Sequence, residues 1–521
     1  MSWSEEVAEI EFRRSLAAQH GGEERVQRQH SQGKYTVRER IDRLVDPGSF
    51  VEYGALAGTG QYEAGRLKSF LPAAYVMGTA RIDGRPICVG GEDFTVRGGS
   101  GGSSAMRRSK GGLGGFIEDL AWEYKLPLVL LLDGSGANVS SVKEMGHTYL
   151  PSSADWTRSV ELLGEVPVVG AVLGSAAGGP AARAMLTHWT CMVRGQSHIF
   201  TAGPPVAKRA LGEDVTKEEL GGATVQVTKS GIIDNAVNSE DEAFTAIRRY
   251  LAFMPQNVYE LPPVMPTTDR RDRREEELLD IVPRHRGKPY KMRRIVELIF
   301  DNDCPPLEIK PEYGGCILTY FARLNGVPVA VTAHNPLVNA GAVDAAGAEK
   351  LTHFLELADY FHFPVINLVD VPGFMIGTRA ELAGTLRKGM RAFYLGYQMA
   401  VPQATIIVRR CYGMAGSFRA SRLNLRLGWP SAEWGSIPIE GGVDAAYKRE
   451  IAEAPDPEQR RIEIEADLRL LRSPWGTAER FGVEDMIDPS KTREILCNWV
   501  ELAQHALKLQ VGQRSMPGVR P

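Results

Sequence analysis

Two short glycine-containing turns are the parts of this sequence that could do chemistry with backbone atoms alone. The first, GSAAGG (174–179), follows the apolar run VPVVGAV (166–172), and the second, YGMAGS (412–417), follows VPQATIIV (401–408). Each turn opens a predicted helix, whose first N–H groups lack a partner within the helix and carry the positive end of its dipole. Such donors stabilise a carbonyl oxygen that becomes negative, as in an enolate.

The first turn suits this role because Gly178 and Gly179 carry no side chain that would obstruct a ligand oxygen, and because Pro180 fits the first helical position. In the second turn, Met414 and Ala415 keep their backbone donors. The alternative is that the glycines only let a strand and a helix pack closely. The residues alone leave both interpretations open.

A third candidate is a glycine-rich loop that starts at Gly98, Gly99 and Ser100. Basic residues cluster in and just before it: Arg97, Arg107, Arg108 and Lys110. A basic loop of this kind suits the phosphate groups of a ligand, and a solvated surface loop is the alternative. The G-x-x-x-x-G-K-[ST] pattern of a P-loop does not occur in the sequence.

The start of this loop, GGSGG (98–102), also satisfies G-x-S-x-G, the pattern around a hydrolase nucleophile. That motif requires an immediate helix, and the glycine-rich residues after Ser100 do not predict one. No spacing selects catalytic partners among the candidates, which are Asp133, His147, His188 and His198. A serine hydrolase is therefore the weaker hypothesis.

Composition limits the class of protein. The 521 residues exceed the ~100 to 200 residues of a usual domain. The 61 basic and 64 acidic residues leave a net charge of -3, so no global field gathers nucleic acid or an anionic membrane. The six scattered cysteines lack a C-x-x-C pair and indicate neither a zinc site nor a disulfide framework. Without a signal peptide or a run of ~18 apolar residues, we expect a cytoplasmic protein.

The elements that must position the turns occur twice along the chain. Each half predicts a hairpin, AYVMGTARI (74–82) with PICV (86–89) and LTYFARL (318–324) with VPVAV (327–331). Each then predicts a helix, Phe116–Tyr124 and Ala342–Tyr360, and a buried strand, LPLVLLLD (126–133) and FPVINLVD (363–370). The strands and turns described above follow in the same order. We infer two homologous α/β domains of roughly 240 residues each.

A segment rich in proline and mixed charge lies between the halves. Its central part, RRDRREEE (270–277), interleaves acids with arginines, which favours a solvated connector over a nucleic-acid patch. We therefore predict a first domain at residues 1–258, a linker at 259–289 and a second domain at 290–521.

Several long motifs resemble the carboxyltransferase β subunit of biotin-dependent acyl-CoA carboxylases, the propionyl-CoA and methylcrotonyl-CoA carboxylase group. The resemblance runs from about Gly21 to Arg493. The motifs that carry it are RQHSQGKYTVRERIDRLVDPGSF (28–50), EDFTVRGGS (92–100), TAGPPVAKRALGEDVTKEELGGA (201–223), VDVPGF (369–374), GWPSAE (428–433) and PWGTAERFGVEDMIDP (474–489). It implies two crotonase-like domains, and a dimer, commonly stacked into a hexamer, in which the first domain of one subunit faces the second domain of the other.

By motif position, the resemblance assigns Gly178 and Gly179 to the acyl-CoA thioester oxygen, and Met414 and Ala415 to the ureido oxygen of biotin. On the acyl-CoA side it adds Gly98, Gly99, Ser100, Arg107, Arg108, Lys110, Gly134, Ser135, Gly136, Ala137 and Asn138. On the biotin side it adds Val371, Pro372, Gly373, Phe374, Gly413 and Ser417. It implies no metal.

The reaction that the resemblance implies needs no side-chain base. Carboxybiotin releases CO₂, the freed ureido nitrogen takes the proton of the acyl-CoA, and the enolate attacks CO₂. The sequence lacks the A-M-K-M framing of a biotin attachment site and an ATP-grasp glycine loop. A partner with biotin carboxylase and biotin carboxyl carrier functions is therefore expected.

Three residues depart from the family pattern at the acyl pocket and the biotin mouth: Asn138, Met414 and Ser417. They leave the acyl group open among acetyl, propionyl, methylcrotonyl and less common groups. The alternatives are the reverse reaction of a biotin-dependent acyl-CoA decarboxylase and a non-catalytic assembly subunit. A biotin-independent hydratase or isomerase would need a glutamate at an oxyanion turn, and neither turn has one.

Overall fold

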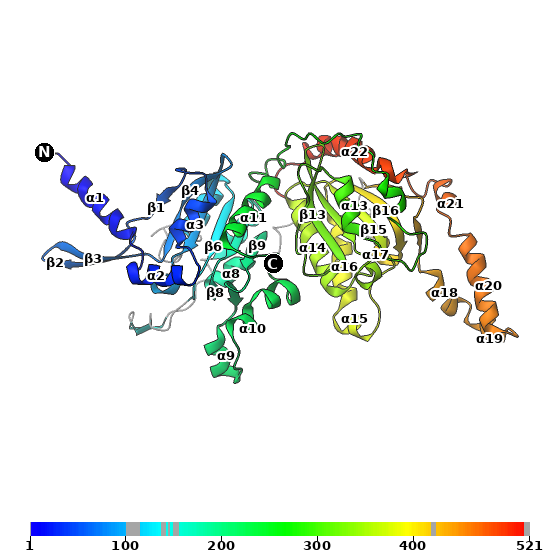
Figure 1. Ribbon diagram of the computed structural model, residues 1–521, viewed down its shortest axis with the longest axis horizontal. Helices are drawn as coiled ribbons and strands as arrows, with labels where there is room; N and C mark the ends of the chain where they lie inside the picture. Colours follow the sequence, from blue (N-terminus) through cyan, green and yellow to red (C-terminus); the bar gives the residue numbers. More distant parts are fainter. Residues whose placement is uncertain are drawn as a thin grey trace. The chain divides into compact units, whose positions relative to one another are not determined.

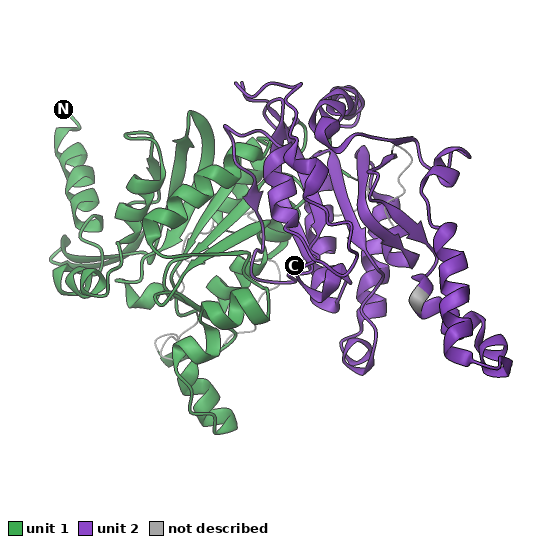
Figure 2. Cartoon of the chain, turned by 45° about the vertical axis from the view of Figure 1, so that its right-hand side comes forward, with its two compact units in different colours: residues 1–260, 512–521 green, residues 261–511 purple. Residues whose placement is uncertain are grey.

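The computed structural model describes residues 2–100, 115–136, 142–143, 146–148, 156–417 and 424–514. The chain divides into two compact units, residues 1–260 with 512–521 (unit 1) and residues 261–511 (unit 2), which Figure 2 colours separately. Each unit is built on one mixed sheet with helices against it (Figure 1). Within the described ranges, no helix has both the length and the apolar character needed to cross a membrane.

The sheet of unit 1 has the strand order β1-β4-β5-β6-β7-β9-β11. An antiparallel part, β1, β4 and β5, continues into parallel pairs from β5 to β11. The strands are β1 Val51–Tyr53, β4 Tyr75–Ile82, β5 Arg85–Glu92, β6 Leu128–Leu132, β7 Val168–Val172, β9 Trp189–Val193 and β11 Asn235–Val237. Two further pairs stand apart, the hairpin β2 Gly58–Glu63 with β3 Arg66–Pro72 and the parallel pair β8 Ser175–Ala177 with β10 His198–Phe200.

The helices of unit 1 include three before the sheet, α1 Ser4–Ala17, α2 Glu23–Ser31 and α3 Val37–Leu44. The others are the 3₁₀ turn η1 Arg97–Gly99, α5 Phe116–Tyr124, α7 Thr157–Leu162, α8 Gly179–Met185, α9 Pro204–Leu211, α10 Lys217–Gly221, the π-helical turn η3 Thr224–Lys229 and α11 Glu240–Phe253. Every residue of β6 and β7 is buried, which agrees with their unbroken apolar sequences and with helices on the sheet faces.

Unit 2 repeats this plan with the order β12-β13-β14-β15-β16-β17-β19, and β18 pairs with β16. Its strands are β12 Leu307–Glu308, β13 Ile317–Leu324, β14 Val327–His334, β15 Val365–Val371, β16 Gln403–Tyr412, β17 Asn424–Gly428, β18 Glu433–Gly435 and β19 Asp485–Met486. Its helices are α12 Glu277–Asp280, α13 Met292–Ile299, η4 Asn339–Gly341, α14 Ala345–Tyr360, α15 Thr378–Leu382, α16 Thr385–Gln398, α17 Gly413–Ser417, α18 Ile439–Ala446, α19 Lys448–Glu453, α20 Pro457–Leu470, α21 Trp475–Ala478, η5 Pro489–Lys491 and α22 Thr492–Leu507.

The two hairpins show the duplication at the level of single hydrogen bonds. In unit 1, the Asp46 carboxylate accepts bonds from the N–H groups of the turn residues Asp83 and Gly84, at 3.0 and 2.8 Å. In unit 2, Asp301 accepts the same pair of bonds from Asn325 and Gly326, at 2.9 and 2.8 Å. This repetition confirms the predicted pair of homologous α/β folds.

Two stretches differ from their predicted form. The predicted turn at 174–179 contains a short strand, β8, because its backbone pairs with β10. The predicted linker belongs to unit 2 from Leu261 onward. Its charges are solvated only in part: Arg273 pairs with Asp269 at 2.7 Å and donates to the carbonyl of Leu298 at 2.9 Å, whereas the side chains of Arg270 and Asp272 are 78% and 51% exposed. Leu278 of α12 is buried in the core of unit 2.

Candidate active site

Three loops of unit 1 meet where its parallel strands end. Ser135 donates from its N–H and its Oγ to the carbonyl of Gly98, at 2.9 and 3.1 Å. The Ser100 Oγ donates to the carbonyl of Gly136 at 2.5 Å. The Ala177 N–H donates to the carbonyl of Gly134 at 3.0 Å. The predicted residues from 98–100 and 134–136 are therefore joined to the turn that contains Gly178 and Gly179.

Glycine is required at the centre of this arrangement by close backbone contact. A Cβ on Gly136 (φ 74°) would lie 2.6 Å from the carbonyl oxygen of Ala177. Gly178 has φ 62°, the left-handed region that side chains rarely adopt. Gly179, at the start of α8, is different, because a Cβ there would meet no atom within 4 Å. The space above Gly179 is thus open to a ligand.

A cavity of about 890 Å³ adjoins these loops, and Gly98 and Ser175 are among its lining residues. Six cationic side chains line it: Arg25, Arg28, Lys34, Arg97, Arg194 and Lys217. The described residues that line it include no Asp or Glu. An anionic ligand of several charges suits such a cavity, since clustered cations of one sign focus the field.

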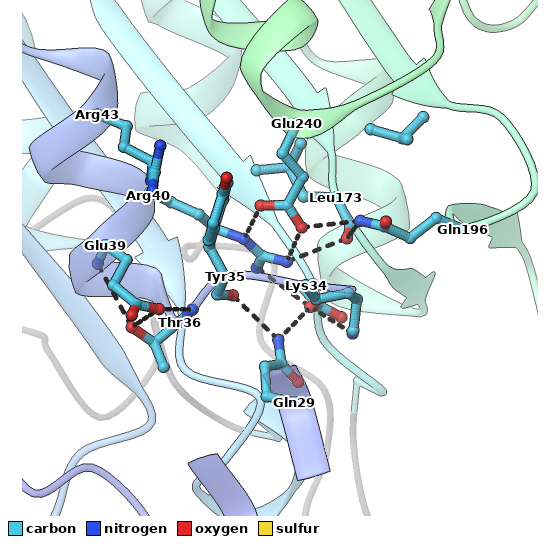
Figure 3. A network of polar contacts seen from close by, with 12 residues as sticks. Gln29, Lys34, Tyr35, Thr36, Glu39, Arg40, Arg43, Leu173, Gln196 and Glu240 are labelled. Carbon is cyan, nitrogen blue, oxygen red and sulfur yellow. Dashed lines mark hydrogen bonds and ion pairs between the residues drawn. The ribbon is translucent and has the colours of Figure 1, made fainter. Parts of the chain in front are cut away.

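Beneath the cavity, a network of buried charges joins the segment after α2 to the ends of two strands (Figure 3). Arg40 of α3 pairs with Glu240 of α11 through two bonds of 2.8 Å and donates to the Leu173 carbonyl at 3.0 Å. Gln196 also donates to Glu240, at 2.8 Å. Because the cavity residue Gln196 takes part in it, the network reaches the cavity lining.

Asp133 lies at the centre of this network, directly after β6. Its Oδ2 accepts bonds from Lys34 Nζ at 2.8 Å, Arg40 Nη1 at 3.1 Å and Gln29 Nε2 at 3.3 Å. Burial alone would raise the pKa of Asp133, but the cations of Arg40 and Lys34 outweigh it and lower that pKa. Asp133 is therefore an ionised, fully buried carboxylate.

The second turn, in unit 2, directly follows β16 and forms the short helix α17. Gly413 has φ 58°, and Ala415 is fully buried. The side chain of Met414 is 47% exposed. Ser417 donates from Oγ to the Met414 carbonyl at 3.0 Å. The turn thus presents its first residues to the outside while Ala415 anchors it.

The segment Val371–Phe374 lies beside this turn because Val371 pairs with Cys411 of β16. Gly373 accepts a bond from the Val343 N–H at 3.1 Å. The Phe374 ring packs against Gly389 of α16, where a Cβ would lie 2.4 Å from the ring. All the predicted biotin-side residues therefore come from two adjacent strand ends.

Unit 2 also places a buried aspartate at its strand end. Asp370 accepts bonds from Arg410 Nε at 2.7 Å, Arg409 Nη2 at 2.9 Å and Tyr290 OH at 2.9 Å. Burial alone would raise the pKa of Asp370, but its hydrogen bond and charge interaction with Arg410, helped by Arg409, lower it. Arg410 also donates to the Ala340 carbonyl of η4 at 2.7 Å.

The serine-hydrolase hypothesis is not supported by these contacts. Asp133 is held by cations, and His188 is buried, where its Nδ1 accepts a bond from the Val168 N–H at 2.9 Å. His198 contacts Glu218 at 3.3 Å, and His147 contacts the carbonyl of its neighbour. In the part of the chain that is described, no group of three or more His, Cys, Asp or Glu side chains is arranged to hold a metal ion.

Five predicted site residues, Arg107, Arg108, Lys110, Ala137 and Asn138, lie outside the described residues. Sequence reasoning missed the cations that reach the cavity from α2 and the segment after it, foremost Arg25, Arg28 and Lys34. The signal for Arg28 and Lys34 was the stretch RQHSQGKYTVRERI (28–41), which indicated the family but not a position in space. Lys34 and Arg40 are about 100 residues from Asp133, and no local periodicity reports such a pair.

Comparison with known proteins places this site in a family. The model of the carboxyl transferase domain matches residues 28–515. The propionyl-CoA carboxylase carboxyltransferase subunit of Haloferax mediterranei is 35% identical over 503 residues, 95% of each chain. The methylmalonyl-CoA carboxyltransferase 12S subunit of Propionibacterium freudenreichii is 35% identical over 512 residues, 95% of this chain and 94% of that protein.

A crystal structure of transcarboxylase 12S, a hexamer assembly with methylmalonyl-coenzyme A bound, matches with a TM-score of 0.87 and 32% identity over 100% of this chain and 97% of that one. Its likeness confirms the predicted tandem crotonase-like fold. The chain therefore belongs to the carboxyl transferase domain family and is a carboxyltransferase subunit of the biotin-dependent acyl-CoA carboxylases.

Proposed function

We propose that this chain moves a carboxyl group from biotin on a partner protein to the α-carbon of a short acyl-CoA of the propionyl class. The observation that carries the proposal is the basic cavity, which is lined in part by Ser175 of the segment 174–179 that ends in Gly178 and Gly179. Coenzyme A has a pyrophosphate and a 3′-phosphate at one end and the thioester at the other. A cationic cavity that adjoins an open backbone turn matches both ends. The relatives named for propionyl-CoA and methylmalonyl-CoA support the acyl class.

In this proposal the backbone N–H groups of Gly178 and Gly179 hold the thioester oxygen as it gains charge. The loops at Gly98–Ser100 and Gly134–Gly136 fix the turn through the four bonds described above. The phosphates bind to the cations of the cavity. By their motif positions alone, we assign Arg107, Arg108 and Lys110 to phosphate binding as well, and Ala137 and Asn138 to binding of the acyl group. The chain's contribution is position and electrostatics rather than a side-chain base.

Biotin supplies the carboxyl group and accepts the proton of the acyl-CoA when it is bound. Unit 2 fits a biotin carried by another protein, because Met414 stands half exposed on its turn. We assign the Met414 and Ala415 N–H groups to the ureido oxygen. Gly413 and Ser417 shape that turn, and the segment from Val371 to Phe374 forms its neighbouring wall.

The same proposal includes the assembly. The partner carries the biotin carboxylase and biotin carboxyl carrier functions, whose motifs do not occur in this sequence. The chain assembles into a hexamer, as transcarboxylase 12S does. The reverse reaction is a second candidate, since the methylmalonyl-CoA decarboxylase subunit alpha of Veillonella parvula is 33% identical over 486 residues.

A panel of acyl-CoA thioesters tests the proposal. The chain is incubated with its biotinylated partner, ATP, labelled bicarbonate and acetyl-, propionyl-, butyryl- or methylcrotonyl-CoA. We expect most label in the product of propionyl-CoA. Normal carboxylation of the partner without labelling of any acyl-CoA would contradict the carboxylase function. Loss of CO₂ from methylmalonyl-CoA, with no forward reaction, would favour the decarboxylase.

A further inference from the structure

Asp133 lies next to two of the segments that support the first turn, the loop from Gly134 and the strand end at Gly174. It is the residue before Gly134, so its backbone begins the loop that bonds to Gly98 and Ala177. A Cβ on Gly174 would lie 2.0 Å from its Oδ1, so the carboxylate packs directly on the strand end that leads to the turn. Its own N–H donates to the buried Glu92 at 3.3 Å. A shift of this side chain therefore moves both loops.

Two cations, Lys34 and Arg40, bond to Asp133, and of these two Lys34 also lines the basic cavity. Its Nζ lies 2.8 Å from Asp133 Oδ2 and 4.6 Å from the centre of the Phe94 ring, and its side chain is only 7% exposed. Arg40, the other cation, is committed to Glu240 and Leu173. An anion in the cavity can thus act on Asp133 through Lys34.

Unit 2 has a similar arrangement, a buried aspartate paired with two cations beside the turn, but the cations come from different elements. Asp370, at the end of the corresponding strand, is held by Arg409 and Arg410. These arginines come from β16, whereas Lys34 and Arg40 come from the N-terminal segments. In unit 2 the link to the turn is direct, because the Arg410 N–H donates to Asp370 three residues before Gly413. Each turn thus has a buried aspartate next to it whose charge is neutralised by cations. Because the cations come from different elements in the two units, we infer that the aspartate is needed to position the turn and is not merely inherited from the duplication.

We propose that Asp133 is a positioning residue for the Gly178–Gly179 turn, and that Lys34 couples the anionic end of the ligand in the cavity to that turn. Binding of the phosphates and alignment of the thioester oxygen are then one event. This inference rests on the proposed function for its kinetic readout, but its structural readout does not.

The test compares Lys34→Met with Arg28→Gln, a matched loss of one cavity cation that does not contact Asp133. Both variants should weaken the binding of free CoA, measured by titration calorimetry. Arg28→Gln should raise KM for propionyl-CoA with kcat unchanged, because it removes uniform binding. Lys34→Met should also lower kcat, by about 10-fold to 100-fold, as expected for a misplaced catalytic group. Lys34→Arg should restore most of kcat.

Hydrogen exchange of backbone amides supplies the second readout. Lys34→Met should speed exchange in the peptides that contain residues 133–136 and 174–179, and Arg28→Gln should not. If Lys34→Met changes only KM and leaves exchange in both peptides as in Arg28→Gln, the positioning role is overturned. If exchange rises while the wild-type chain carboxylates no acyl-CoA, the proposed function fails and the positioning role stands. Should Lys34→Met not fold, Lys34→Gln replaces it with the same outcomes.

Discussion

Substitution of Gly179 separates catalysis from folding better than any other change at the turn. A Cβ at this position meets no atom within 4 Å, and the residue starts α8 without a left-handed φ. Alanine here meets no atom beyond its own chain neighbours, so the change in folding free energy should stay within about 1 kcal/mol, with the gain from replacing a helical glycine opposed by the restriction on a residue before proline. Gly178, with φ 62°, would add backbone strain and is unsuitable.

The new side chain would occupy the space where the thioester oxygen approaches the backbone donors. Loss of one oxyanion donor costs about 3 to 4 kcal/mol, or roughly 100-fold to 1000-fold in kcat. We expect a graded loss, about 10-fold for Gly179→Ala, where the donor remains, and about 100-fold or more for Gly179→Val, where the branched group blocks it. The thermal midpoint should stay within a few degrees of wild type.

The assay is the initial rate of carboxylation against propionyl-CoA concentration, with a thermal melt of each variant. Gly203→Ala is the matched control, because Gly203 also precedes a proline at the start of a helix and an added Cβ meets its neighbours only at 3.5 Å or more. It should retain wild-type turnover. Unchanged kcat/KM in Gly179→Val would remove Gly179 from the site.

Two further predictions concern stability. Asp301→Ala should lower the free energy of unfolding by about 3 kcal/mol, because it frees two turn N–H groups and removes the nearer of the two carboxylates that face the buried Arg493, Asp301 at 2.8 Å and Asp269 at 3.5 Å. Asp46→Ala, at a partly exposed copy of the same cap, should cost about 1 kcal/mol. Equal shifts in the denaturant midpoint would contradict this difference. Burial raises the pKa of Glu92 to about 7, so its contribution to stability is present below pH ~4.3 and lost as pH rises through 7. The free energy of unfolding of Glu92→Gln should therefore rise relative to that of wild type by up to about 3 kcal/mol as the pH goes from 5 to 8, measured by urea titration. A difference between the two proteins that does not change with pH would refute this prediction.

The sequence carried the local features of the fold well. The NG and DG turns and the alternation around them located both hairpins, and the apolar runs located β6 and β15 within two residues. The helix predicted from Ala342 starts at Ala345 because Asp344 caps it, accepting a bond from the Gly347 N–H at 2.8 Å. That start was visible as an N-cap residue, but periodicity alone does not mark it.

Ion pairs between residues far apart in the sequence could not be predicted from the sequence. The mixed charges at 270–277 predicted a solvated connector, yet Arg273 pairs with Asp269 and donates to a backbone carbonyl of unit 2. Lys34 and Asp133 meet only because the sheet brings the end of β6 to the N-terminal segments. Sequence motifs predicted the turns at Gly178 and Met414. They did not predict the basic cavity, because side chains from elements far apart in the sequence form it.

The most direct measurement isolates the half-reaction assigned to this chain. The partner's biotin is first carboxylated with labelled bicarbonate and freed of ATP and bicarbonate, and the chain is then added with propionyl-CoA in a single turnover. We expect label to move from biotin to the CoA product, and Gly179→Val to slow this transfer about 100-fold or more. Label that stays on biotin, or leaves only as CO₂ while propionyl-CoA is unchanged, would contradict it.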